Sequence, residues 1–437
     1  MIDSSRLLSA VRSCRTLQVE GRVTEMTGII IKACIPGIET GELCLIGRSG
    51  RLPLPAEVVG FRDDLAFLMP LGNCRHISPM CPVRSTGLST SIRCGSFLLG
   101  QVLDVAELLR DSSRDRNGGR VPLDRDPPAP MMRKRITRQL RLGVRSLDVF
   151  VPVGEGQRLG VFAAAGTGKS TLLGMIARGA DVDVNVVALI GERGREVREF
   201  VEDNLGEKGM QRSVVVVATS DAPALVRLKA AFAATAIAEY FRDQGLHVLL
   251  MMDSVTRFAR AQREIGLAIG EPPARGGYTP SVFSTLPRLL ERAGNSERGS
   301  ITGLYTVLVA GDDLTEPVAD EVMSILDGHI ILSRRIAGSG IYPAVDLLLS
   351  KSRILTQLVS GENLERISTL LELLALHEEN RDAIAYGIYR SGANDRIDQA
   401  IRIMPPLLEL LRQQNPDDRC PAELHECFAR ILSEHAP

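Results

Sequence analysis

A glycine-containing turn with a lysine and two hydroxyl residues lies near the middle of the chain, where residues 162–171 read FAAAGTGKST. The pattern G-x-x-x-x-G-K-S/T is typical of phosphate-binding loops, whose backbone N–H groups point at phosphate oxygens. Lys169 could reach the β- and γ-phosphates of a nucleoside triphosphate, and the Ser170 hydroxyl could bind Mg²⁺. The first glycine of the pattern is replaced by Ala163, and two more alanines follow.

We expect the backbone of this loop, rather than its side chains, to contact phosphate. Gly166 and Gly168 allow a positive φ and a close approach of the backbone. If Ala164 or Ala165 had to take a positive φ, each would cost on the order of 1 kcal/mol. The alternative, an ordinary strand–helix turn with a surface lysine, is disfavoured by the flanking apolar strand and helix. The predicted nucleotide-binding residues of the loop are Ala164, Ala165, Gly166, Thr167, Gly168, Lys169, Ser170 and Thr171.

Two carboxylates follow apolar runs elsewhere in the chain. Asp253 ends the run HVLLMMD, and Glu192 follows the run VNVVALI within the charged turn GERGRE. Ligands of open α/β sheets bind at the carboxyl ends of the strands. Asp253 could therefore hold Mg²⁺ through water, or it could cap the helix that follows. Glu192 could polarise an attacking water, with Arg193 holding it or touching phosphate, although such a turn can also be a solvated loop.

The elements that must position these residues are strands and helices in alternation. Continuous apolar strands between helical segments are typical of a parallel sheet covered on both faces. Before this region, short β-rich runs from residue 18 to 70 indicate a small β-barrel, and a Pro- and Gly-rich surface connection follows at 110–131. The predicted strands are residues 158–163, 184–190, 213–219, 247–253, 303–310 and 329–333.

Only helical patterns follow residue 360, and Pro405-Pro406 is expected to break the second long helix. An apolar stripe on the first of these helices comprises Leu364, Ile367, Leu370, Leu371 and Leu374. With 437 residues, two or three domains are expected. We predict a barrel over residues 1–85, an α/β core with the phosphate loop over 86–360 and a helical domain over 361–437.

Composition disfavours binding to nucleic acid or membrane through overall charge, although it does not exclude a local basic groove. The net charge is −1, so no global field attracts nucleic acid or anionic membrane. There is no Trp and aromatic residues make up 4%, which leaves few stacking platforms for single-stranded nucleic acid. None of the eight cysteines forms a C-x-x-C pair, which favours free thiols in a reducing cytosol. No signal peptide or membrane-spanning stretch is expected, so any membrane contact should be peripheral.

Several segments together resemble the type III protein-secretion ATPases, relatives of the catalytic subunit of rotary ATP synthases. They include GEGQRLGVFAAAGTGKSTLLGMIAR, ALIGERGREVREF, the run LLMMDSVTRFARAQREIGLAIGEPPARGGYTPSVFSTLPRLLERAG, and IYPAVDLLLSKSR. The resemblance is dense from about residue 127 to 360 and weaker towards both ends. It implies an α/β fold with a RecA-like P-loop ATPase core over residues 86–360, an N-terminal small β-barrel that serves oligomerisation and a C-terminal helical domain.

The resemblance also implies roles for single residues, with ATP and Mg²⁺ as cofactors. Lys169, Ser170 and Thr171 would hold phosphates and Mg²⁺, with Asp253 at the Mg²⁺ site. Glu192 would activate water, beside Arg193. Arg353 matches an arginine donated to the neighbouring subunit's nucleotide, and Tyr342 matches a position that packs on adenine, although an ordinary half-buried tyrosine is an equal alternative. Arg257, Arg260 and Arg263 recur every third residue and could face phosphate or a ring channel, but a solvated helix face is the simpler interpretation.

At the level of the assembly, the resemblance implies a homo-hexamer at the cytoplasmic face of the inner membrane. Its partners would be stalk and stator-type regulator proteins, the export gate and chaperone–substrate complexes, with no nucleic acid. ATP hydrolysis would release chaperones and unfold exported proteins. We favour an injection system over a flagellar exporter, because the N-terminal third and the connection diverge. The alternatives are a non-catalytic ring subunit, which would lack Glu192 or the loop lysine, and a nucleic-acid-translocating hexamer, which would need a basic or aromatic barrel.

Overall fold

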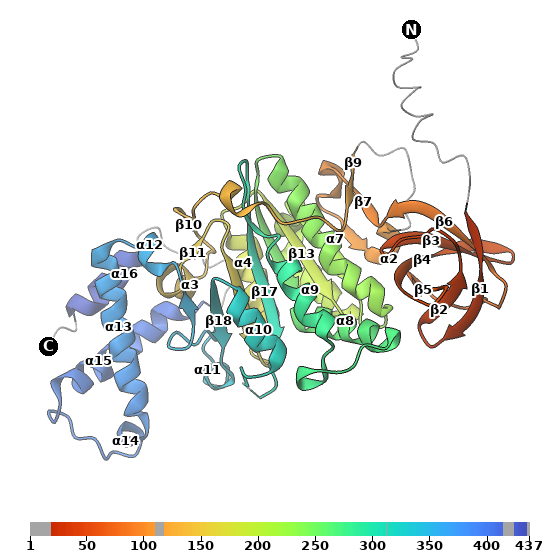
Figure 1. Ribbon diagram of the computed structural model, residues 1–437. Coiled ribbons are helices and arrows are strands. Elements are labelled where there is room, and N and C mark those ends of the chain that lie inside the picture. The colour runs from red at the N-terminus through yellow and green to blue at the C-terminus, as the bar shows by residue number, and fades with distance from the viewer. Residues whose placement is uncertain (1–18, 110–117, 312, 414–423, 435–437) are drawn as a thin grey trace, which may run out of the picture.

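The chain forms three parts in a row, with a β-barrel and a helical domain at opposite ends of a sheet-and-helix core (Figure 1). This computed structural model describes residues 19–109, 118–311, 313–413 and 424–434. Parts of the predicted barrel domain, connection and helical domain therefore lie outside the described residues. The predicted fold class is confirmed, whereas the predicted domain limits at 85/86 and 360/361 stay predictions.

Six strands close the N-terminal barrel in the order β1-β2-β5-β4-β3-β6. Side chains alternate between the interior and the surface, as in β3, where Cys44 and Ile46 are buried and their neighbours are partly exposed. Glu57 of the barrel binds Lys229 of the core at 2.6 Å and so ties the two parts together. The strands are β1 (Glu20–Thr27), β2 (Ile30–Cys34), β3 (Glu42–Arg48), β4 (Arg51–Arg62), β5 (Leu65–Pro70) and β6 (Pro82–Ser89).

The core sheet has the strand order β19-β18-β12-β17-β15-β13-β14-β8, with β16 (Gly294–Asn295) paired to β17 at the side. Among the described strands of this sheet, β18–β19 and β16–β17 pair antiparallel and the other neighbours pair parallel. All six predicted strands are present. Their apolar runs are continuous because both faces of the sheet are covered. The strands are β8 (Val102–Asp104), β12 (Arg158–Ala163), β13 (Val184–Ile190), β14 (Ser213–Ala218), β15 (His247–Asp253), β17 (Ser300–Leu308), β18 (Gly328–Leu332) and β19 (Lys351–Ser352).

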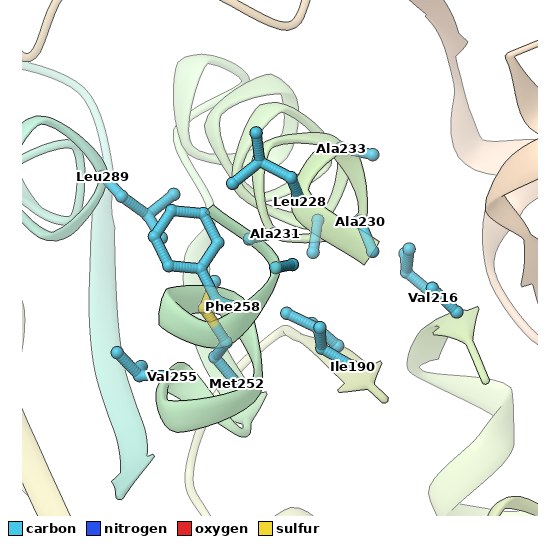
Figure 2. Packing of buried hydrophobic residues seen from close by; sticks show 14 of the residues in the cluster. Ile190, Val216, Leu228, Ala230, Ala231, Ala233, Met252, Val255, Phe258 and Leu289 are labelled. Atoms are coloured by element: carbon cyan, nitrogen blue, oxygen red, sulfur yellow. The ribbon is translucent and has the colours of Figure 1, made fainter. Parts of the chain in front are cut away.

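One face of this sheet packs on helices α7 (Ala224–Asp243), α8 (Val255–Ile269), α9 (Pro280–Leu290) and α10 (Pro317–Ile325). Figure 2 shows Ile190, Val216 and Met252, from three neighbouring strands, beneath residues of α7 and α8. The side of α7 nearest the sheet is rich in buried alanines, whose small side chains let the helix approach closely. The opposite face of the sheet packs on α4 (Lys169–Gly179).

The C-terminal part consists of α13 (Gly361–Glu379), α14 (Arg381–Ala385), α15 (Asp395–Leu411) and α16 (Leu424–Glu434). The predicted break at Pro405-Pro406 is wrong, because α15 runs through both prolines. Two interior prolines cost about 3 kcal/mol each. Burial of an apolar side chain stabilises the fold by about 1.5–3 kcal/mol. Four apolar side chains are buried near the prolines, two before them and two after them, so their packing outweighs the lost backbone hydrogen bonds. These side chains are Ile403, Met404, Leu407 and Leu411.

The connection predicted at 110–131 is partly ordered by the core. Residues 110–117 lie outside the described part, but β9 (Gly119–Pro122) pairs with β7 (Ser91–Cys94). Arg292, fully buried, donates to the carbonyl of Leu123 at 2.6 Å and to both carboxylate oxygens of the buried Glu239. The buried charges of Arg292 and Glu239 are thereby paired, and the hydrogen bond to Leu123 holds the connection against the core. Among the described residues, no helix is both long enough and apolar enough to cross a bilayer.

Candidate active site

The phosphate-binding loop joins the end of β12 to the start of α4 without strain at its alanines. Gly166 and Gly168 both have a φ of +82°. Among the described residues, positive φ at non-glycine positions is confined to Asp63, His76 and Met80, so the possible cost at Ala164 and Ala165 does not arise. The hydroxyl of Thr167 donates to the carbonyl of Ala164 at 2.9 Å and closes the loop on itself.

The N-terminus of α4 is open to a ligand. Gly168 occupies the N-cap position and supplies no side-chain acceptor for the first backbone N–H groups of the helix. Ser170 and Thr171, in the first turn, are exposed. Free N–H groups at a helix N-terminus attract anions, and an exposed hydroxyl oxygen is a ligand that Mg²⁺ accepts.

Lys169 and Asp253 meet across the sheet. The Lys169 ammonium binds Asp253 Oδ1, and the Thr306 hydroxyl of β17 donates to the same oxygen at 2.7 Å. Asp253 is 3% exposed. The cap of α8 is Ser254 rather than Asp253, so the second interpretation of Asp253 is wrong. The Asp253 carboxyl group and the Lys169 side chain thus lie together beside the phosphate loop, and Asp253 and Ser170 offer the oxygen ligands that Mg²⁺ prefers.

Glu192 lies beside this pair, just beyond β13. The turn is fixed by its backbone, because Gly191 N donates to the carbonyl of Ala218 at 2.6 Å and Ser220 N donates to the carbonyl of Glu192 at 3.0 Å. Glu192 Oε1 lies 3.9 Å from Lys169 Nζ. Burial, then hydrogen bonding with Glu196, then the charge of Asp253 raise the pKa of Glu192 to about 7. A carboxylate with a pKa near the working pH is well suited to act as a general base.

The raised pKa of Glu192 predicts a pH dependence. A base must be deprotonated, so kcat/KM for ATP should fall as the pH drops through about 7 and level off above it. Glu196→Gln should move this acidic limb to lower pH, because the variant removes a negative charge that favours protonation of Glu192. Initial rates between pH 5.5 and 9 test this. Full activity of the natural protein down to pH 5.5 would contradict the predicted shift.

Three further side chains belong to this neighbourhood. Arg193 is exposed and lies 3.8 Å from Glu196, between its Nε and Oε1 atoms. Arg257 packs on the Glu192 turn, since a Cβ at Gly191 would lie 3.1 Å from Arg257 Cβ. Arg257 is therefore not on a solvated face, whereas Arg260 is exposed and Arg263 lies over the ring of Tyr278. Spacing alone did not single out Glu196 or Thr306.

Tyr342 lies against the phosphate loop. A Cβ at Gly168 would be 3.2 Å from Tyr342 Cε1, so the ring contacts the glycine directly before Lys169. The carbonyl of Tyr342 accepts a hydrogen bond from Gln413 N at 2.8 Å, which holds this segment. A half-buried aromatic ring beside the loop offers a face on which a nucleobase can stack.

Two glycine substitutions should separate backbone strain from contact with Tyr342. Gly166→Ala and Gly168→Ala both place a Cβ at a φ of +82°, at a cost of about 1–2 kcal/mol. Only the Cβ at residue 168 also meets the Tyr342 ring. We expect ATP affinity to fall about tenfold in Gly166→Ala and further in Gly168→Ala, by titration with a fluorescent ATP analogue. Ala165→Gly, at negative φ, is the control; equal affinities in all three variants would refute this.

The structure does not bring Arg353 to the other candidate residues within one chain. Arg353 follows β19, whose Ser352 pairs with Gly328 at the start of β18. Because β18 runs parallel to β12, the phosphate loop lies at the opposite end of these strands. Arg353 is exposed, and its Nη2 donates to the carbonyl of Met323 at 3.2 Å. An arginine at this position can act on a nucleotide only if the nucleotide belongs to another chain.

Comparison with known sequences agrees with this geometry. Residues 143–352 match the ATP synthase alpha/beta family, nucleotide-binding domain, and residues 359–427 match the T3SS EscN ATPase C-terminal domain. The chain is 48% identical over 436 residues to the flagellum-specific ATP synthase of Bacillus subtilis, covering 99% of each. It is 50% identical over 404 residues to the type 3 secretion system ATPase of Xanthomonas euvesicatoria, covering 92% of this chain and 91% of the relative.

Solved structures extend the likeness to the whole fold. The assembled ATPase EscN of the enteropathogenic E. coli type III secretion system superposes with a TM-score of 0.88 at 43% identity, covering 94% of this chain and 100% of that one. EscN in complex with its central stalk EscO superposes with a TM-score of 0.86 at 42% identity. Since sequence and fold agree over nearly the full length, the chain belongs to the family of type III secretion and flagellar export ATPases.

Proposed function

We propose that this chain is the ATP-hydrolysing motor of a type III protein-secretion apparatus, using Mg²⁺-bound ATP to release chaperones and unfold exported proteins. The observation that carries the proposal is the meeting of Lys169, Asp253 and Glu192 at the carboxyl edge of the sheet. A non-catalytic ring subunit would not need a buried carboxylate whose pKa is raised towards neutrality beside the loop lysine.

Each residue has a role that its surroundings support. The loop N–H groups of residues 164–171 and the Lys169 ammonium bind the β- and γ-phosphates. Ser170 and Asp253 would hold Mg²⁺, which when bound would supply positive charge beside the phosphates. Glu192 orients the attacking water and accepts its proton, with Arg193 beside it. Tyr342 packs on the adenine. Arg353 acts in the neighbouring chain's site.

The position of Arg353 supports a ring, because its guanidinium can reach a nucleotide only from another chain. EscN is described as an assembled ATPase and as a complex with its central stalk EscO. We propose a homo-hexamer with a stalk-type partner along its axis, and with stator-type regulators, chaperone–substrate complexes and the inner-membrane export gate as further contacts. The chain would work in the cytoplasm, peripherally at the inner membrane, and would bind no nucleic acid.

The kind of apparatus is a separate proposal. Divergence of the N-terminal third and the connection supports an injection system. A flagellar exporter is the second candidate, and it is favoured by the flagellar relative that matches over 99% of the chain, the N-terminal third included. Genome neighbours decide between them, because needle and secretin genes accompany one system and rod and hook genes the other.

One assay tests the proposed function. Purified full-length protein should hydrolyse ATP with Mg²⁺ and lose this activity with excess chelator. Specific activity should rise steeply with protein concentration, because sites shared between chains form only on assembly. RNA should not change the rate. Strong stimulation by RNA, or a specific activity independent of concentration with no assembly, would point to a different function.

A further inference from the structure

The turn that precedes β12 is in contact with the segment that carries Arg353. Gln157, in this turn, has no exposed surface. Its side-chain Nε2 donates to the Ser352 hydroxyl at 3.2 Å and to the Asp327 carbonyl at 3.0 Å. Its Oε1 accepts from Gly154 N at 2.9 Å. The amide of Gln157 therefore uses both its donor and its acceptor end, and one of its partners is the residue directly before Arg353.

The Asp327 carbonyl is the second link to Arg353. It accepts hydrogen bonds from both Gln157 Nε2 and Arg353 N, each at 3.0 Å. Asp327 is itself fixed, since its carboxylate accepts from Arg158 N and Nε at 3.1 Å and from Arg158 Nη2 at 3.2 Å. The backbone at Arg353 is thus tied through Asp327 to two consecutive residues: Gln157 shares the Asp327 carbonyl with Arg353, and Arg158 binds the Asp327 carboxylate.

An apolar contact holds the chain on the other side of Arg353, and we call these contacts of residues 154–157 with residues 352 and 354 the Gln157 seat. A Cβ at Gly154 would lie 2.8 Å from Ile354 Cδ1, so the side chain of Ile354 packs directly on the glycine backbone. A Cβ at Gly328 would similarly lie 2.5 Å from the carbonyl of Lys351, which shows how closely β18 and β19 approach. Residues 352 and 354 are both held by the turn of residues 154–157, while the guanidinium between them stays exposed.

We propose that Gln157 is a positioning residue for Arg353. The inference rests on the proposed role of Arg353 in the neighbouring chain's site. An exposed arginine has many rotamers, so the aim of its guanidinium depends on how firmly its backbone is held. Catalysis is sensitive to such placement, since an error of about 1 Å can lower a rate about 100-fold.

The competing explanation is that Gln157 only satisfies buried backbone groups, as most buried amides do. The two explanations differ in which active site should lose activity when Gln157 is replaced. A structural defect would damage the chain's own phosphate loop, which follows Gln157 along β12. A positioning defect would leave that loop intact and damage the site of the neighbouring chain.

The test uses full-length Gln157→Met, which keeps the size of the side chain and removes its hydrogen bonds. We expect turnover of MgATP to fall about 10- to 100-fold, with unchanged affinity for a fluorescent ATP analogue. Mixing with an equal amount of Lys169→Ala chains should then partly restore turnover. At about one interface in four, the intact phosphate loop of a Gln157→Met chain faces the undisturbed Arg353 of a Lys169→Ala chain. Lys169→Ala chains alone should stay inactive.

Parallel mixtures keep the outcomes distinct. If Arg353→Ala is rescued by Lys169→Ala and Gln157→Met is not, the positioning role is wrong while the proposed function stands. If neither is rescued although rings form, the role of Arg353 between chains is wrong and this inference falls with it. Ser352→Ala removes only one hydrogen-bond partner of the Gln157 amide and should lower turnover several-fold. This variant tests the positioning role if Gln157→Met fails to fold. Thr235→Ala removes a buried hydroxyl within α7 and is the control, with turnover unchanged.

Discussion

Rings of Arg353→Ala chains should hydrolyse ATP about 10³- to 10⁵-fold more slowly than the natural protein, the usual effect of removing an arginine finger. Each chain should still bind nucleotide, since Arg353 lies at the opposite end of the sheet from its own phosphate loop. Steady-state turnover and titration with a nucleotide analogue measure the two quantities separately. Arg353→Lys should recover little, because a lysine ammonium lacks the planar fork that contacts two phosphate oxygens.

Mixtures give the sharper version of this experiment. Arg353→Ala chains have an intact phosphate loop and Lys169→Ala chains have an intact arginine, so mixed rings should regain part of the turnover that neither protein has alone. Lys351→Ala removes an exposed positive charge two residues away and is the control for charge, with turnover near that of the natural protein. Intact mixed rings without any regained activity would contradict a site shared between chains.

Glu192→Gln should keep nucleotide binding and lower turnover by about 10²- to 10⁴-fold, the usual contribution of a positioned base. The amide has the size of the carboxyl group but cannot accept the proton of the attacking water. Single-turnover rates with excess enzyme measure the chemical step directly. Glu199→Gln, an exposed change of the same type on the neighbouring helix, is the control, and turnover retained by Glu192→Gln would remove the residue from its role.

The same substitution makes a second prediction, about stability. Folding raises the pKa of Glu192 from 4.5 to about 7, mainly through burial, so the charged form is disfavoured in the folded chain. The resulting loss of stability is absent below pH 4.5 and fully present above pH 7. Glu192→Gln should therefore unfold at the same or a higher temperature than the natural protein at pH 8. A lower unfolding temperature at that pH would show that the carboxylate is stabilised by contacts, not penalised by burial.

The strands could be predicted from the sequence because a sheet covered on both faces leaves continuous apolar runs. Glu192 and Asp253 could be proposed because each follows such a run, and the ends of parallel strands share an edge. The pair Pro405-Pro406 misled, since local propensity was outweighed by the packing of α15. The alanines of the phosphate loop raised a question of strain that only backbone angles could answer, and both have negative φ.

Other residues left no readable trace in the sequence. Thr306 and Gln157 matter through partners distant in the chain, at Asp253 and at Ser352. In the sequence, Glu196 is one of several charged residues in a turn. Only the structure shows that it raises the pKa of the buried Glu192. Arg353 is an exposed residue by every local criterion, and only the family resemblance suggested a function for it. Spacing predicts what lies on one strand or helix, whereas these contacts depend on how separate elements come together.

The short strand β12 lies between two functional sites. β12 is six residues long, about 20 Å, with the phosphate loop at its carboxyl end and the Gln157 seat of Arg353 at its amino end. The backbone of one strand joins the two sites, so a shift of β12 along its axis would move both of them. If Arg353 acts in the adjoining chain's site, β12 of each subunit connects that subunit's own nucleotide site with the site of its neighbour.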